Sequence, residues 1–176
     1  MRGKNSHDNC SARISRIAWE DPDMNALELL EKDHQRVTSL FDRLQQADSL
    51  GDKRKLFEII QQELEMHSYV EETILYPVFS RREGFREMIE EAFDEHQEIK
   101  DLLEEMEMTF SQAHDTEDEI DLIDDKFDEL MDTFEHHVDE EENELFPKIK
   151  EVTDGKQLEQ IGVQLEAAKD DHSAVA

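Results

Sequence analysis

The chain of 176 residues has little cysteine, proline, glycine and positive charge, and each shortage narrows what it can be. The single cysteine, Cys10, excludes an internal disulfide and a cysteine-based metal cage. Only 3 prolines and 5 glycines interrupt a sequence rich in Glu, Leu and Lys, which favours helices throughout. The 19 basic residues are outnumbered by 48 acidic ones, and a formal net charge of −29 argues against binding to a nucleic-acid backbone.

Long apolar runs are missing as well. No stretch approaches the roughly 20 apolar residues that a membrane-spanning helix needs, so we expect no membrane partner. The start of the chain carries basic side chains but lacks the apolar segment of a secretory signal. We therefore expect a cytoplasmic protein, and the length suits one domain with tails.

The chain divides into an arm, a helical body and a short C-terminal helix. Residues 1–23 lack apolar periodicity and are expected to form a mobile arm. Residues 24–152 should form the body, and residues 153–176 should form a short helix and tail. Within these limits, amphipathic patterns predict helices over the following approximate ranges: 25–47, 52–80, 85–113, 116–150 and 156–168.

Apolar residues recur every three or four positions along each of the four long patterns, as in a helix that faces a bundle core. In the second pattern we expect this inward stripe to include Ile74 and Val78. Short connections favour antiparallel neighbours. The sequence therefore predicts an all-α fold, an antiparallel up-down-up-down four-helix bundle with a short extra C-terminal helix.

An internal repeat relates the two halves of the bundle. The segment HSYVEETILYP, which begins at His67, matches HVDEEENELFP, which begins at His137. Each copy ends in a proline, Pro77 or Pro147, that we expect to kink or terminate its helix. The halves thus resemble one helical hairpin used twice, which would place two equivalent sets of side chains across one core.

Polar residues interrupt the apolar stripes at one level of the predicted bundle. A carboxylate in a dry core costs several kcal/mol unless it is paired or bound to a cation, and two facing carboxylates cost more. Counting ~1.5 Å of rise per residue from the helix ends brings all of these side chains to one layer. The candidate metal ligands are His34, His67, Glu71, His96, His137 and Glu141.

Imidazole nitrogens and carboxylate oxygens suit iron, manganese or zinc. Six convergent donors exceed what one tetrahedral zinc ion needs, so ligand counting favours two ions. The ferritin-like pattern of Glu-x-x-His on two helices is matched only once, at Glu31 and His34, which disfavours a ferritin-like oxidase. A buried hydrogen-bonded network without metal is the remaining alternative.

The order His34, His67-x-x-x-Glu71, His96, His137-x-x-x-Glu141, with the flanking EExxLxP pattern, resembles the hemerythrin-like (HHE cation-binding) family over residues 25–150. The resemblance implies a non-haem di-iron centre bridged by carboxylates and an oxo or hydroxo group. Oxygen-carrying hemerythrins have a further histidine where this chain has Lys100, and the related iron–sulfur repair proteins carry an additional cysteine-bearing domain. The departure at Lys100 implies a more open and more reactive centre than that of a simple oxygen store, and the short arm with Cys10 argues against an iron–sulfur repair protein.

Several charged neighbours of these residues are expected to have lesser roles. Glu72 and Glu142 follow the candidate ligands but fall off the stripe, so we expect them to support the centre or lie in solvent. Asp33 and Glu95 precede candidate ligands and are expected to be plain surface charges, although a role in orienting ligands is the alternative. His136 is expected at the surface.

Three functions remain open at this point. The leading one is a di-iron protein that binds or reacts with oxygen, nitric oxide or peroxide in sensing or stress defence. The second is an iron store, donor or sensor without turnover, and the third is an interaction module with the bundle as scaffold. Apolar residues one turn from the candidate ligands favour the first, because they would form a dry pocket for a small ligand: Leu30, Val37, Leu64, Ile74, Ile99 and Phe134.

Overall fold

A computed structural model describes residues 24–114 and 116–173 of the chain. Within these ranges all regular structure is helical. The expected N-terminal arm, with Cys10, lies outside the described residues, as do the last three residues of the expected tail. None of the described helices combines the length and apolar character needed to cross a membrane.

The first half of the bundle is a helical hairpin. Helix α1 (Ala26–Gln45) runs antiparallel to α2 (Leu50–Val70), which continues without a break through η1 (Glu71–Leu75) and α3 (Tyr76–Phe79). The side chain of Asn25 caps α1 as the sequence predicts, because it accepts hydrogen bonds from the first-turn backbone while Glu28 reaches back to the Asn25 N–H.

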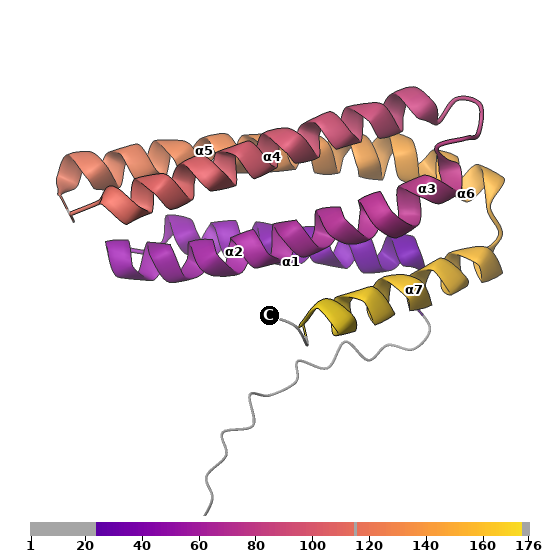
Figure 1. Cartoon of the computed structure of the whole chain (residues 1–176), viewed down its shortest axis with the longest axis horizontal. Coiled ribbons are helices and arrows are strands. Elements are labelled where there is room, and N and C mark those ends of the chain that lie inside the picture. The colour runs from indigo at the N-terminus through magenta and orange to yellow at the C-terminus, as the bar shows by residue number, and fades with distance from the viewer. Residues whose placement is uncertain (1–23, 115, 174–176) are drawn as a thin grey trace, which may run out of the picture.

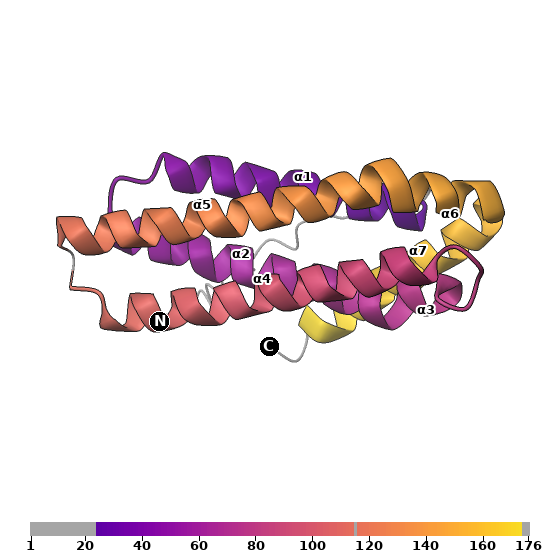
Figure 2. The same ribbon diagram turned by 90° about the horizontal axis from the view of Figure 1, so that it is seen from above.

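The second half repeats this construction. Helix α4 (Arg86–Gln112) runs antiparallel to α5 (Glu117–Glu140), which continues through η2 (Glu141–Leu145) into α6 (Phe146–Val152). Figure 1 shows the α1–α2 pair and the α4–α5 pair as two layers, and Figure 2 shows the long helices side by side. The predicted four-helix bundle is therefore confirmed.

The segments η1 and η2 are single π-helical turns, which the sequence analysis did not predict. Each turn adds one residue to the helical repeat, so the inward stripe shifts by one position beyond it. Leu75 and Phe79 are therefore fully buried, whereas Ile74 and Val78 are only partly buried, contrary to expectation. The helices also continue beyond Pro77 and Pro147, so neither proline terminates its helix at that position.

The core consists of two apolar clusters with a polar layer between them. One cluster includes Val37, Leu64 and Phe134, and the other includes Leu30 and Leu75. Leu30 and Val37 lie about one helical turn on either side of His34, yet they belong to different clusters. The candidate ligands therefore occupy the boundary between two hydrophobic halves.

The C-terminal helix α7 (Gly155–Ser173) is longer than the predicted range and packs against α1 and α2 near the end of the bundle where α3 lies. Its apolar side, with Leu158, Ile161 and Leu165, joins the second core cluster. At Gly162 an added Cβ would lie 3.1 Å from the Ala26 nitrogen, so the contact with α1 depends on the missing side chain.

Candidate metal centre

The structure brings all six predicted residues together in the buried layer. Two overlapping groups have their nitrogen or oxygen atoms within 4.8 Å of one another: one of His34, His67, His137 and Glu141, and one of His67, Glu71, His96 and His137. The exposed fractions are His34 2%, His67 2%, Glu71 0%, His96 0%, His137 0% and Glu141 1%. Because all six side chains are buried, solvent water does not hydrate their polar atoms, which must be satisfied by other protein groups or by a bound ion.

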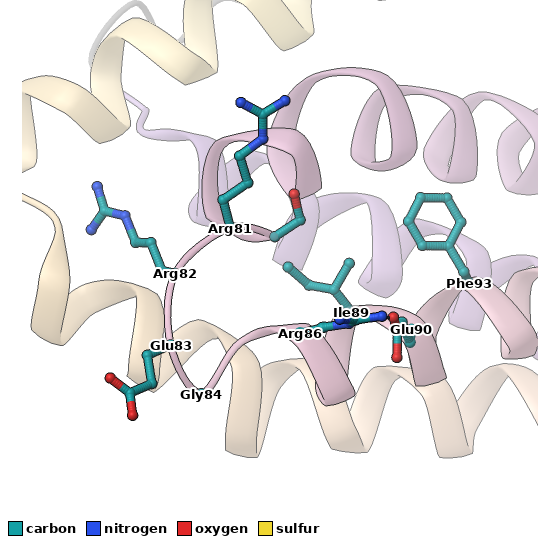
Figure 3. Close-up of a pocket in the computed structure, with 9 residues that line it drawn as sticks. Arg81, Arg82, Glu83, Gly84, Arg86, Ile89, Glu90 and Phe93 are labelled. Carbon is teal, nitrogen blue, oxygen red and sulfur yellow. Dashed lines mark hydrogen bonds and ion pairs between the residues drawn. The ribbon is translucent and has the colours of Figure 1, made fainter.

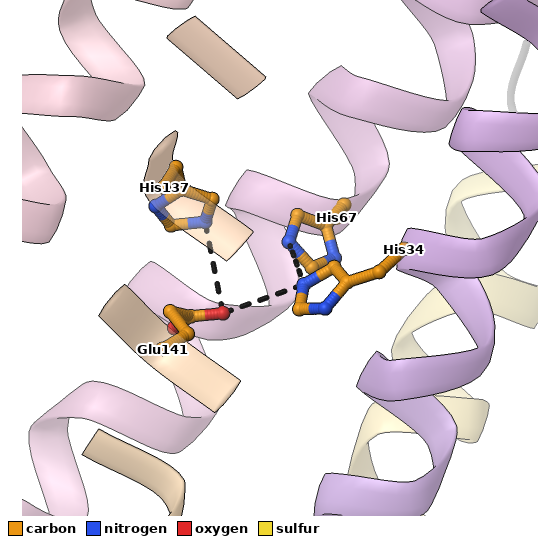
Figure 4. Close-up of side chains that lie close together, drawn as sticks. All are labelled: His34, His67, His137 and Glu141. Carbon is orange, nitrogen blue, oxygen red and sulfur yellow. Dashed lines mark hydrogen bonds and ion pairs between the residues drawn. The ribbon is translucent and has the colours of Figure 1, made fainter. Parts of the chain in front are cut away.

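The histidine rings meet in pairs through their Nε2 atoms. His34 Nε2 lies 3.2 Å from His67 Nε2, and His96 Nε2 lies 3.3 Å from His137 Nε2. In Figure 4 the rings of His34, His67 and His137 converge with the carboxylate of Glu141. Each hairpin thus supplies one pair of nitrogen donors.

The two buried glutamates connect the hairpins. Glu71 Oε2 lies 3.1 Å from His67 Nε2 in its own hairpin and 3.3 Å from His96 Nε2 in the other. Glu141 Oε2 lies 3.6 Å from His137 Nε2 and 3.4 Å from His34 Nε2, again one contact in each hairpin. Each carboxylate is therefore placed to bridge donors from both halves.

Further carboxylates contact the Nδ1 atoms of the histidines, on the side of each ring that faces away from the centre. The Nδ1 atom of His34 lies 2.8 Å from Glu142, and that of His96 lies 2.9 Å from Glu72, so each pair joins the two hairpins. These contacts realise the supporting role expected as one alternative for Glu72 and Glu142. Lys100, the position of the additional histidine in oxygen-carrying hemerythrins, pairs with Glu72 at 2.7 Å and does not enter the centre.

Asp33 and Glu95 are not the surface charges that the sequence analysis favoured. They are 7% and 8% exposed, and Glu95 Oε2 lies 2.9 Å from His137 Nδ1. Asp33 lies 3.9 Å from His67 Nδ1, too far for a direct hydrogen bond, because the aspartate is one methylene shorter. The signal that could have identified them is their repeated place directly before His34 and His96.

The donor geometry fits bound cations. A carboxylate against Nδ1 makes that nitrogen the N–H donor of a neutral imidazole, and the lone pair then lies on Nε2. In the second hairpin both His96 and His137 have such a carboxylate, and two Nε2 lone pairs that face each other across 3.3 Å are unfavourable unless a proton or a metal ion lies between them. Oxygens Glu71 Oε1 and Glu141 Oε2 also have no hydrogen-bond partner in the described structure. A bound cation would accept the facing Nε2 lone pairs and would also give the buried carboxylate oxygens a partner.

The electrostatics of the side chains alone shows the same conflict. Burial and the neighbouring Glu141 raise the pKa of Glu71 well above its usual value. Burial lowers the pKa of His67 to about 3. Burial also disfavours the charged form of His34, but its contact with Glu141 outweighs this effect and raises the pKa of His34 to about 9. One carboxylate and one histidine therefore tend toward neutrality while their neighbours stay charged.

One pair of residues breaks the symmetry of the centre. The Tyr76 ring stacks on His96, and its counterpart Phe146 stacks on His34, with centroid distances of 5.8 Å and 6.0 Å. Only the tyrosine has a hydroxyl group, which donates to Glu141 Oε1 at 2.8 Å. The same hydroxyl lies 3.4 Å from Glu71 Oε2, and Phe146 adds no second donor, so the two buried glutamates share one hydroxyl unequally.

A wide surface hollow lies apart from this centre. It has a volume of about 690 Å³ and is formed by the connection between α3 and α4, with Arg81, Arg82 and Phe93 on its lining. Figure 3 shows the Arg81 and Arg82 side chains directed away from each other, and Arg86 is paired with Glu90 at 2.7 Å. This hollow contains none of the six predicted residues and gathers no convergent charge.

A four-helix bundle with imidazole and carboxylate groups converging in its core defines a metal-binding helical-bundle protein. The sequence profile of the Hemerythrin HHE cation binding domain matches residues 25–149, and the chain belongs to this family. Its domain binds metal cations, and the histidine–glutamate cluster could hold them. The ligand roles of the six individual residues remain a prediction.

Two curated relatives extend the comparison. A DNA nickase of Nostoc sp. is 31% identical over 147 residues, which cover 84% of this chain and 40% of that protein. An uncharacterized hemerythrin-like protein of Schizosaccharomyces pombe is 30% identical over 120 residues, which cover 66% of this chain and 55% of that protein. The chain thus spans about half the length of these relatives or less. No solved structure matches the chain significantly.

Proposed function

We propose that this chain is a non-haem di-iron protein that binds or reacts with oxygen, nitric oxide or peroxide. The observation that carries the proposal is the facing of Nε2 atoms in two pairs, His34 with His67 and His96 with His137. Two such pairs with two bridging carboxylates suit two ions with octahedral preference, and iron takes this donor set. Manganese and zinc also accept these donors, so metal analysis is part of the test.

A bound iron pair would supply redox chemistry and coordination positions for a small ligand. The chain's own residues would hold and orient the donors: Glu72, Glu95 and Glu142 fix ring positions through Nδ1. Tyr76 would keep a proton against Glu141. Water is excluded by the apolar residues above and below the layer, which are at most 2% exposed: Leu30, Val37, Leu64, Ile99 and Phe134.

The direct test is metal analysis and an optical spectrum of protein purified without oxygen. We expect two irons per chain and absorption bands that change after addition of oxygen, nitric oxide or peroxide. His137 belongs to both groups of converging donor atoms. His137→Gln keeps a polar side chain of similar length but removes this nitrogen donor, so the variant should lose both the iron and the absorption bands. A colourless wild-type protein without iron would contradict the proposal.

Iron storage, donation or sensing by the same centre is the second candidate. It is supported by the buried oxygens Glu71 Oε1 and Glu141 Oε2, which have no hydrogen-bond partner among the described residues. A core that needs a cation to satisfy such oxygens would become less stable when the cation leaves, so the fold itself would respond to iron. Turnover of peroxide or nitric oxide by the iron-loaded protein would favour the first candidate. Iron that is bound and released without turnover would favour the second. A protein without stoichiometric metal would contradict both and would favour the third function, an interaction module.

We do not extend the DNA chemistry in the name of the Nostoc relative to this chain. The chain spans 40% of that protein, and its formal net charge of −29 opposes contact with a phosphate backbone. The expectation of no nucleic-acid partner therefore stays a prediction, which an electrophoretic mobility assay with duplex DNA would check.

A further inference from the structure

The two hairpins differ on the outer side of the layer where His67 and His137 lie. In the first hairpin this side is formed by Met66, Val70 and Ile74, and α7 covers it with apolar side chains. The repeat places three different residues at the same positions of the second hairpin, where no described helix takes the place of α7: His136, Glu140 and Glu144. The pseudo-twofold relation thus contrasts a covered apolar flank with an open one carrying an imidazole and carboxylates.

Three side chains converge on the open flank. His136 Nε2 lies 3.6 Å from Glu95 Oε1 and 3.4 Å from Glu140 Oε1. One nitrogen or oxygen atom from each of the three residues lies within 4.8 Å of the other two. His136 is exposed, whereas Glu95 is 8% exposed. The group therefore extends from the surface to the buried layer.

The buried member of this group has an unused oxygen. Glu95 Oε2 accepts the hydrogen bond of His137 Nδ1, but Glu95 Oε1 has no hydrogen-bond partner among the described residues and is turned toward His136. A buried carboxylate oxygen without a partner is costly, and a cation between Glu95, His136 and Glu140 would satisfy it.

A small cavity lies beside these residues. Its volume is about 20 Å³, enough for one water molecule or one ion. Carboxylate-bearing residues from α4, α5 and η2 dominate its lining, and one of them is the candidate ligand Glu141. The cavity therefore borders two members of the outer group and one candidate ligand of the inner centre: its lining includes Glu91, Glu95, Glu140, Glu141 and Glu144.

We propose that His136, Glu95 and Glu140 form an outer divalent-cation site that loads the inner centre. One imidazole nitrogen and two carboxylate oxygens suit a first-row divalent ion such as Fe²⁺ or Mn²⁺. The ion would first bind where the local negative charge concentrates cations, then pass through the acidic cavity to Glu141. The loading step rests on the proposed function of the inner centre, whereas the outer site does not.

Equilibrium binding of Mn²⁺ to the full chain, stripped of metal, tests the outer site. Free Mn²⁺ is measured by electron paramagnetic resonance for the wild type, His136→Ala and Glu140→Gln. We expect each variant to bind one Mn²⁺ per chain fewer than the wild type. Ions that remain bound in the variants report the inner centre, so failure of either proposal is seen separately.

The rate of anaerobic Fe²⁺ uptake tests the loading role. Protection of Fe²⁺ from a colorimetric chelator is followed after mixing with metal-free protein, and both variants should load about tenfold more slowly to an unchanged final occupancy. Glu135→Gln is the matched control, because it removes one exposed charge from the same helix. It should bind and load as the wild type does.

Equal Mn²⁺ stoichiometry in the wild type and both variants would overturn the outer site. A lost Mn²⁺ with an unchanged uptake rate would support the site and overturn its loading role. Slowing by Glu135→Gln equal to that by Glu140→Gln would also overturn the loading role, since overall charge alone would then explain the rate.

Discussion

Lys169 of α7 forms an ion pair with Asp33 of α1, the carboxylate that lies beside His67. Asp33 is 7% exposed, and although burial opposes ionisation, His67 and Lys169 together lower its pKa. The C-terminal helix is therefore connected electrostatically to one side of the metal centre. The corresponding carboxylate of the second hairpin, Glu95, has the exposed His136 as its outer neighbour.

Lys169→Met should destabilise the protein by about 1–2 kcal/mol, because it leaves the buried Asp33 carboxylate without this partner. Urea unfolding of the metal-free chain measures the effect. Lys150→Met is the matched control: Lys150 pairs with Glu31 at 3.3 Å, and the two side chains are 53% and 35% exposed. This control should change the stability by less than about 0.5 kcal/mol, and equal effects of the two variants would contradict a buried role for Asp33.

Glu71→Gln should make the metal-free protein more stable at pH 8 than the metal-free wild type. The folded-state pKa of Glu71 is raised, so its contribution to stability is present at low pH and is lost as the pH rises. A glutamine mimics the neutral form and should recover roughly 1–3 kcal/mol. The same variant should lose most of the stabilisation by added metal.

Thermal unfolding with and without metal measures both effects of Glu71→Gln. Glu58→Gln, an exposed change on the same helix, serves as the control and should leave both melting temperatures unchanged. If Glu71→Gln melted below the metal-free wild type at pH 8, the electrostatic account of the centre would be wrong.

The metal-free wild type should lose stability between pH 6.5 and pH 9. The pKa of His34 is raised from 6.5 to about 9, so its contribution is complete below pH 6.5 and disappears as the pH rises through 9. The loss is on the order of 3 kcal/mol. His67, whose pKa is lowered to about 3, is neutral across this window and adds no slope.

Urea unfolding at four or five pH values gives this slope. His34→Gln removes the titrating ring and should flatten the curve in the same window. A slope that persists unchanged in His34→Gln would assign the loss to another group.

Glu142→Ala and Glu72→Ala should each weaken metal binding about 10- to 100-fold, because they release the Nδ1 atoms of His34 and His96. Competition with a chelator of known affinity measures the change. Similar losses in both variants would reflect the pseudo-twofold relation of the two contacts. An unchanged affinity in both would show that these carboxylates do not orient the rings that bind metal.

Gly162→Ala should destabilise the protein although alanine is the better helix former by about 1 kcal/mol. The added Cβ would lie 3.1 Å from backbone atoms of Met24 and Ala26, which must move. Gly51→Ala is the matched control, since no atom lies within 4 Å of its added Cβ. Thermal unfolding should lower the melting temperature for the first variant and preserve or raise it for the second.

Periodicity and repetition in the sequence were enough to predict the bundle and the set of six buried side chains. The spacing of His67 from Glu71, and of His137 from Glu141, places each pair on one helical face whatever the surroundings. Burying these groups in an apolar stripe is costly without a cation, so residue chemistry alone already pointed to a metal.

Only the tertiary structure decided which charges support the centre and which face water. Asp33 and Glu95 read as surface charges because helical periodicity does not show that a neighbouring helix covers them. The π-turns at Glu71 and Glu141 shift the following stripe by one residue, and this shift depends on backbone hydrogen bonds rather than on residue type. Likewise, α7 covers one flank and leaves the other open, because packing between distant segments determines what each repeated position touches.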